Sequence, residues 1–383
     1  MKQTITGQLS QTRIASPEPM GSYAPSDVIF LLKDLSGVQL ERPTEDREEA
    51  IQSGVHYSEM LPVEYQPTAE YIELFHRTLT ESAGKVALAA AVVAERIVLK
   101  RGLKGVLVSL ARAGTPIGIL IKRYIAYRYG ADMPHYSISI IRGKGIDENA
   151  VLYMLQQHGL DSYLQFVDGW TGKGAIRQVL TQASNDFAEK YGYRLDDDLA
   201  VLADPGFCCE TYGTREDFLI PSACLNSTVS GLMSRTVLRD DLIGPDEFHG
   251  AKFYREWLEN DLSNLFVDTV SDFFPAVAET AYQQAVAMTE REAEVSWKGL
   301  ADIRAIQQAF GIDDVNLVKP GVGETTRVLL RRVPWRILVD RMDNPFLQHI
   351  LLLAKDRGVP VEVYPGLTYS CCGIIKPLKG GTE

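Results

Sequence analysis

Short apolar runs and amphipathic segments alternate through the first two thirds of the chain. Strands are predicted where β-rich apolar residues run together, at 105–110, 136–141, 162–169 and 199–206. Apolar residues recur at helical spacing in the segments between and before these strands, at 67–100, 116–130, 148–159 and 175–192. Strands that alternate with helices predict a parallel sheet with helices on both faces.

A second, smaller α/β unit is predicted after about residue 300. A helix followed by a strand is predicted in 328–340, a helix in 346–358, and a strand in 359–365. An acidic helical stretch at 257–297 precedes this unit. We therefore predict one domain over 1–295 and another over 300–383.

Composition and charge indicate a soluble protein. The 383 residues carry a net charge of −11, which argues against non-specific nucleic-acid binding by the whole chain. The segment from 302 onward is different, with four Lys and seven Arg against six Asp and three Glu. The longest apolar run, 86–99, contains Glu95 and Arg96, so we expect a buried helix there. No secretory signal is apparent, and we expect a cytoplasmic protein that does not enter the membrane.

The cysteines do not form the pattern of a disulfide framework or a zinc site. There are five, two pairs are adjacent, and CxxC does not occur: Cys208, Cys209, Cys224, Cys371 and Cys372. Reduced thiols are expected, with Cys371 and Cys372 in a strand.

The segment 166–180, FVDGWTGKGAIRQVL, is the most informative motif. Its strand ends at Asp168, a glycine-containing loop follows, and a helix then begins. Loop amides and a helix N-terminus directed at one point are suited to a phosphate, and Lys173 adds a positive charge. A strand–helix turn that needs glycine only for its backbone conformation is the simpler alternative.

Two further strand–loop segments are candidates for anion binding. VLVSLARAGTPIG, at 106–118, places Arg112 in its turn, and IIRGKGID, at 140–147, places Arg142 and Lys144 in a basic loop. The carboxyl ends of parallel strands lie along one edge of a sheet, so these turns are expected to converge.

SLARAGTP resembles the pyrophosphate loop of type I phosphoribosyltransferases, and VDGWTGKGA resembles their phosphoribosyl-pyrophosphate motif. The resemblance implies a parallel-sheet fold of that type, phosphoribosyl pyrophosphate as substrate, Mg²⁺, and a nucleobase-like acceptor. It also implies a role for each residue of the loops. Asp168 would hold the ribose and the metal, and the 5′-phosphate would be held by Thr171, Gly172, Lys173 and Gly174. The pyrophosphate would be held by Arg112, Ala113 and Gly114, and Arg142 and Lys144 would be cations of a mobile loop. Gly169 departs from the motif, which usually has a second acidic residue there.

Longer runs resemble a bacterial family from tellurite-resistance and stress-response gene clusters, the StiP family, whose members are labelled both phosphoribosyltransferase-like and cysteine protease. The similar runs are 51–62, 109–118, 212–238 and 248–258, while 318–340 and 358–376 resemble a pelota-type RNA-binding domain.

Three functions follow from these resemblances. The first expectation is a phosphoribosyltransferase-like enzyme that binds a phosphorylated sugar or nucleotide. The alternative is a cysteine protease that uses Cys224, or Cys208 or Cys209, with His249 or His56 as base. The third is a non-catalytic nucleotide- or RNA-binding protein, with RNA bound through 300–383. A homo-oligomer is compatible with each of these functions.

Overall fold

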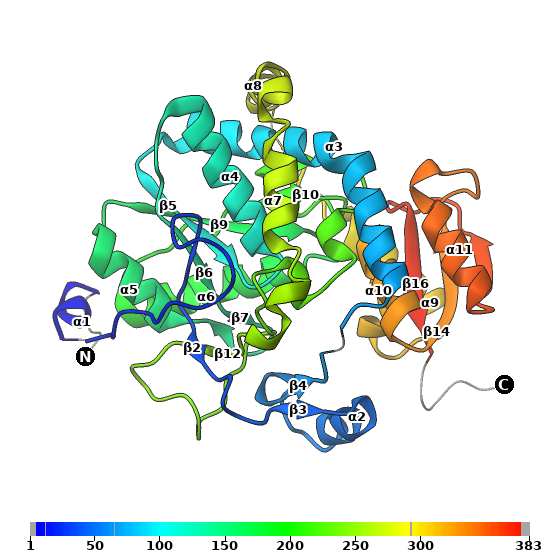
Figure 1. The fold of residues 1–383 in the computed structure, drawn as a ribbon, viewed down its shortest axis with the longest axis horizontal. Helices are drawn as coiled ribbons and strands as arrows, with labels where there is room; N and C mark the ends of the chain where they lie inside the picture. The colour runs from blue at the N-terminus through cyan, green and yellow to red at the C-terminus, as the bar shows by residue number, and fades with distance from the viewer. Residues whose placement is uncertain (1–4, 12, 65, 292, 377–383) are drawn as a thin grey trace.

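The computed structural model describes residues 5–11, 13–64, 66–291 and 293–376 (Figure 1). Its main sheet has six strands, paired in parallel in the order β1-β6-β5-β9-β10-β11. Their bounds are β1 Ile29–Phe30, β5 Gly105–Leu110, β6 His135–Ile138, β9 Tyr163–Trp170, β10 Leu199–Ala203 and β11 Tyr212–Thr214.

Helices cover both faces of this sheet, as the alternation predicts. One face packs on α3 (Ala69–Arg101) and α4 (Gly114–Tyr129), against which α7 (Ser263–Ser271) and α8 (Phe274–Thr289) pack in turn. The other face packs on α5 (Glu148–His158) and α6 (Ala175–Tyr191). Within β5, Leu107 belongs to the first apolar cluster, whereas Val106 and Val108 belong to the second. Side chains alternate along a strand, so a fully apolar strand supplies both cores.

The strand order reverses direction at β5. From β5 the chain moves to β6 on one side and then returns to β9 on the other. Ligands of open parallel sheets bind where the strand order reverses in this way. The loops after β5 and β9 are the ones in which the anion motifs lie.

Smaller elements surround this edge. Strand β2 (Lys33–Asp34) pairs with β12 (Gly250–Ala251), β3 (Glu41–Arg42) with β4 (Leu61–Pro62), and β7 (Ile140–Ile141) with β8 (Gly145–Ile146). Two short helices, α1 (Ile5–Gln11) and α2 (Thr44–Gln52), belong to the N-terminal segments.

The C-terminal segment forms a second sheet, in the order β13-β16-β14-β15. Only β14 and β15 pair in parallel there, because β16 runs antiparallel to β13 and β14. The bounds are α9 Lys298–Ala309, β13 Val318–Pro320, α10 Val322–Arg331, β14 Pro334–Val339, α11 Gln348–Asp356, β15 Val361–Val363 and β16 Cys371–Ile375. In Figure 1 this unit lies beside the main sheet, with α10 facing it.

The prediction of a parallel sheet followed by a smaller α/β unit is confirmed, and Cys371 and Cys372 lie in a strand as expected. The boundary between 295 and 300 stays a prediction. Each helix in the described ranges is too short or too polar to cross a bilayer.

Candidate functional site

The turn after β5 packs directly against the last residues of β9 at the carboxyl edge of the sheet. A Cβ atom added to Gly114 would lie 2.5 Å from the backbone oxygen of Val167, and one added to Gly169 would lie 3.2 Å from that of Ala113. Glycine at 114 therefore permits a backbone approach that no side chain allows. The turn after β5 therefore lies against the last residues of β9, and the joint binding of an anion by 112–114 and 171–174 stays a prediction.

The C-terminal unit covers the loop at 171–174. Tyr369 Oη donates to the backbone oxygen of Gly172 over 3.0 Å. Lys173 Nζ donates to the backbone oxygen of Val315 over 3.0 Å and to Asn316 Oδ1 over 2.9 Å. Protein groups thus bind the Lys173 ammonium group, which was expected to face a phosphate.

Gly174 and Thr171 are also committed to internal contacts. Gly174 has φ 78° and is bracketed by the Trp297 ring and by Cys208, whose Sγ would lie 3.1 Å from an added Cβ. The Thr171 hydroxyl donates to Asp204 and accepts from the backbone N–H of Gly206. Because of these contacts, the loop at 171–174 is packed between the main sheet domain and the C-terminal unit.

Asp168 is a poor fit for the Mg²⁺ that the resemblance implies. Its Oδ1 accepts the backbone N–H of Gly169 over 2.7 Å, and burial raises the pKa of this carboxyl group to about 7. The Arg327 guanidinium favours the charged form. Mg²⁺ in proteins needs several oxygen ligands, and one carboxyl group beside a cation does not supply them.

The basic residues of the other two loops take different positions. Arg112 Nη1 lies 3.4 Å from Glu64 Oε1 and 3.2 Å from the backbone oxygen of Met233, so it is held by protein groups. Arg142 and Lys144 are exposed in the turn between β7 and β8.

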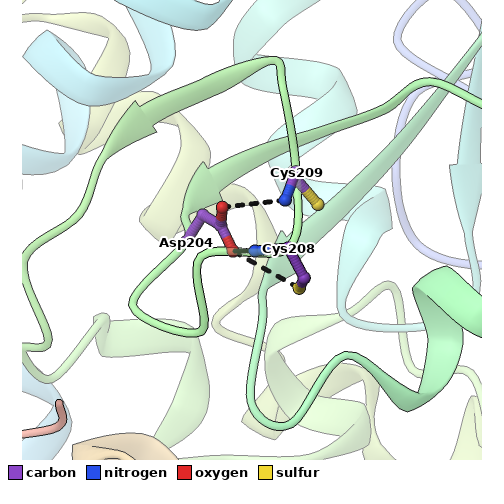
Figure 2. Close-up of side chains that lie close together, drawn as sticks. All are labelled: Asp204, Cys208 and Cys209. Atoms are coloured by element: carbon purple, nitrogen blue, oxygen red, sulfur yellow. Dashed lines mark hydrogen bonds between the residues drawn. The ribbon is translucent and has the colours of Figure 1, made fainter. Parts of the chain in front are cut away.

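Asp204 forms hydrogen bonds with Cys208 and Cys209 in the segment that follows β10, as Figure 2 shows. Its carboxylate accepts the backbone N–H groups of Cys208 and Cys209 over 3.1 and 2.9 Å. Arg215 and the Thr171 hydroxyl donate to the same carboxylate. Backbone donors and a guanidinium satisfy this charge, although the side chain has no exposed surface.

The Cys208 thiol is also a donor to Asp204, with Sγ 3.5 Å from Oδ1. Sequence reasoning named both cysteines but did not recognise Asp204, although the strand-ending ADPGFCC places an acid four residues before Cys208. The hydrogen bond between the Cys209 thiol and Cys208, together with burial, raises the pKa of Cys209. Cys209 therefore stays a protonated thiol at neutral pH.

The structure places Cys224 and His249 in different surroundings. Cys224 is fully buried at the end of a short 3₁₀ helix, 221–223, within the larger apolar cluster. His249 Nδ1 lies 2.9 Å from Ser139 Oγ, its backbone N–H donates to Asp147, and burial lowers its pKa. The contacts that orient this imidazole come from the segments after β6 and before α5.

His56 is the second histidine considered as a base. Its Nδ1 lies 2.8 Å from Ser58 Oγ, and its ring packs on Tyr57 with centroids 4.6 Å apart. It therefore borders the Arg142 turn, because Tyr57 accepts the backbone N–H of Arg142.

Comparison with known proteins identifies the family of both parts of the chain. Residues 21–271 match a family model described as tellurite-like stress resistance cysteine protease StiP, and residues 297–377 match the PELOTA RNA binding domain. A cysteine protease StiP from Acinetobacter baylyi (strain ATCC 33305 / BD413 / ADP1) is 35% identical over 356 residues, which cover 90% of each chain.

The expectation of phosphoribosyltransferase activity is therefore wrong. The family model and the relative both name a cysteine protease. The structure supplies a physical reason, since the loop expected to hold the 5′-phosphate is covered by Tyr369 and Trp297. By the family model and by this similarity, the chain belongs to the StiP family.

Proposed function

We propose that this chain is a cysteine protease whose nucleophile is Cys208. The observation that supports this residue is the contact between its thiol and the buried Asp204 carboxylate, with Sγ 3.5 Å from Oδ1. The pair lies at the carboxyl edge of the main sheet, where ligands of this architecture bind. A thiol needs a neighbouring group that takes its proton, and Asp204 is in position for this role.

The other four thiols are less suited to nucleophilic attack. Burial is the leading cause that raises the pKa of Cys371 and Cys372, and the hydrogen bond of Cys209 with Cys208 is the leading cause for Cys209. Cys224 packs among apolar side chains. Buried thiols in apolar surroundings are generally inert.

The chemistry follows from the Cys208–Asp204 contact. The Sγ–H proton passes to Asp204 as Sγ bonds to the substrate carbonyl carbon, whose oxygen becomes negatively charged. The carbon–nitrogen bond then breaks, and the leaving amine takes the proton from Asp204. Water attacks the remaining thioester, the carbon–sulfur bond breaks, and Cys208 regains its proton as the carboxylic acid leaves.

Access to Cys208 requires the cover above it to move. Cys208 is 1% exposed, and the segments that contain Trp297 and Tyr369 pack on the loop of this cysteine. The backbone N–H groups of Trp297 and Gly299 donate to Phe207 and Gly206, at 3.0 and 3.3 Å. A substrate would reach the nucleophile when the C-terminal unit shifts from this loop.

Hydrolysis of a fluorescently labelled casein by the full chain would test this proposal. We expect Cys208→Ser to reduce the rate to background, and the matched variant Cys224→Ser to retain it. Iodoacetamide should inactivate the wild-type chain in step with modification of Cys208. Full activity of Cys208→Ser would exclude Cys208 as the nucleophile, and activity after complete alkylation would exclude thiol chemistry altogether.

We also propose that the C-terminal unit binds RNA. The match of 297–377 to the PELOTA RNA binding domain supports this function.

At the level of fold alone, the glycine-tight loops after β5 and β9 support a sheet of the phosphoribosyltransferase-like type.

A further inference from the structure

The C-terminal unit has a groove of about 340 Å³ where α10 ends and β14 begins. Its two walls are 332–335, at the start of β14, and 357–360, between α11 and β15. Hydrogen bonds fix these walls, since Arg357 Nη2 donates to the backbone oxygen of Leu330 over 3.3 Å, and the backbone N–H of Ile337 donates to that of Pro360 over 2.9 Å. The groove is therefore a built feature of the fold.

The charged side chains of this groove are all positive. Arg332 stands on one wall and Arg357 on the other, and both are exposed. Lys376 lies beside them, because its backbone N–H donates to the backbone oxygen of Val333 over 2.9 Å. No acidic side chain lines either wall, and every wall residue belongs to the described part of the chain. A concave surface of this charge attracts a polyanion.

Apolar surface lies between the two arginines. The Val333 side chain is 59% exposed, and Pro334 and Pro360 line the groove on its two walls. A single strand of RNA presents the matching chemistry, since its phosphates alternate with unstacked bases whose flat faces are apolar.

The opposite end of α10 is already in contact with the main sheet domain. The Asp217 carboxylate accepts the backbone N–H groups of Val322 and Ser370, each over 2.9 Å, and Tyr369 donates to Gly172. Helix α10 has ten residues and is therefore about 15 Å long. A ligand in the groove thus binds at the end of the helix away from this contact.

We propose that this groove is the site at which the C-terminal unit binds single-stranded RNA. This inference rests on the proposed RNA binding of that unit and extends it by naming the site and the form of the RNA. Arg332 and Arg357 each neutralise a phosphate, and a base between them covers Val333. Binding here does not require the C-terminal unit to shift from the Cys208 loop.

Fluorescence anisotropy with a short labelled single-stranded RNA would test the groove on the full chain. We expect Arg332→Gln and Arg357→Gln each to weaken binding about three- to tenfold at low salt. Each should also reduce the slope of log affinity against log salt concentration by about 0.7, the contribution of one phosphate contact to a single strand.

Two further variants sharpen this test. Val333→Glu places a negative charge between the arginines and should weaken binding at least as much, with the urea midpoint unchanged because the side chain is exposed. Arg304→Gln is the matched control, since this exposed arginine of α9 belongs to the same unit but lies outside the groove.

Each outcome decides a different part of the proposal. RNA binding that the three groove variants leave unchanged, or that Arg304→Gln weakens equally, would overturn the groove and leave RNA binding by the C-terminal unit intact. Absence of RNA binding by the wild-type chain would overturn both. Polyglutamate is the second probe: if it displaces the RNA at an equal concentration of charges, the groove takes acidic peptides and the RNA assignment is overturned.

Discussion

Tyr369→Phe should let the cover lift from Cys208 more often than in the wild-type chain. The substitution keeps the ring but removes the hydrogen bond from Oη to the backbone oxygen of Gly172, which measures 3.0 Å. A hydrogen bond of this kind contributes about 1 kcal/mol net, so the open population should rise about fivefold. Tyr369 is 1% exposed, so water does not replace the lost partner while the cover is closed.

The assay is the rate at which iodoacetamide modifies Cys208, followed by mass spectrometry of the digested chain. When opening and closing are fast relative to alkylation, this rate follows the open population, so it should also rise about fivefold. Tyr282→Phe, on the exposed surface of α8, is the matched control and should leave the rate unchanged.

Gly299→Ala gives a stronger version of the same test. An added Cβ would clash with the Tyr369 phenol and lie 2.9 Å from the Cα of Gly206. Overpacking of this kind costs about 1–3 kcal/mol, which should raise the alkylation rate by about five- to 150-fold. An unchanged rate in both variants, with the fold intact, would refute the reasoning that the C-terminal unit controls access to Cys208.

Three further predictions concern stability. Gly114→Ala should lower the free energy of unfolding in urea by about 2–3 kcal/mol, because its Cβ would meet the backbone oxygen of Val167. The control Gly37→Ala has open space around it and should change this free energy little. Equal urea midpoints for the two variants would contradict the close approach at Gly114. Asp204→Ala should cost about 3–5 kcal/mol, since it leaves buried donors and a guanidinium without their carboxylate, and a loss below that of an exposed aspartate would contradict this role. Burial lowers the pKa of His135 to about 4, so the neutral imidazole is favoured in the fold, and stability falls as the pH drops below the unfolded pKa of 6.5. From pH 7 to pH 5 the free energy of unfolding of the wild-type chain should fall by about 2 kcal/mol more than that of His135→Gln. Identical pH profiles of the two chains would exclude this contribution.

Much of the local structure could be predicted from the sequence. The strand at 105–110 and the long helix after 67 were located closely, because a continuous apolar run and a 3.6-residue period are properties of neighbouring residues. The contact of the turn after β5 with the end of β9 also followed, since parallel strands bring their carboxyl ends to one edge.

The sequence alone determined the alternation of elements, the buried strands, and the positions of the thiols and basic residues along the chain. Only the tertiary structure decided what surrounds them: that Tyr369 and Lys173 close the loop after β9, that Asp204 faces Cys208, and that His249 is held by Ser139. The physical reason is that a glycine turn with a hydroxyl and a cation has the same local sequence whether a phosphate or the protein's own side chains fill it. Packing of segments more than a hundred residues apart makes that choice.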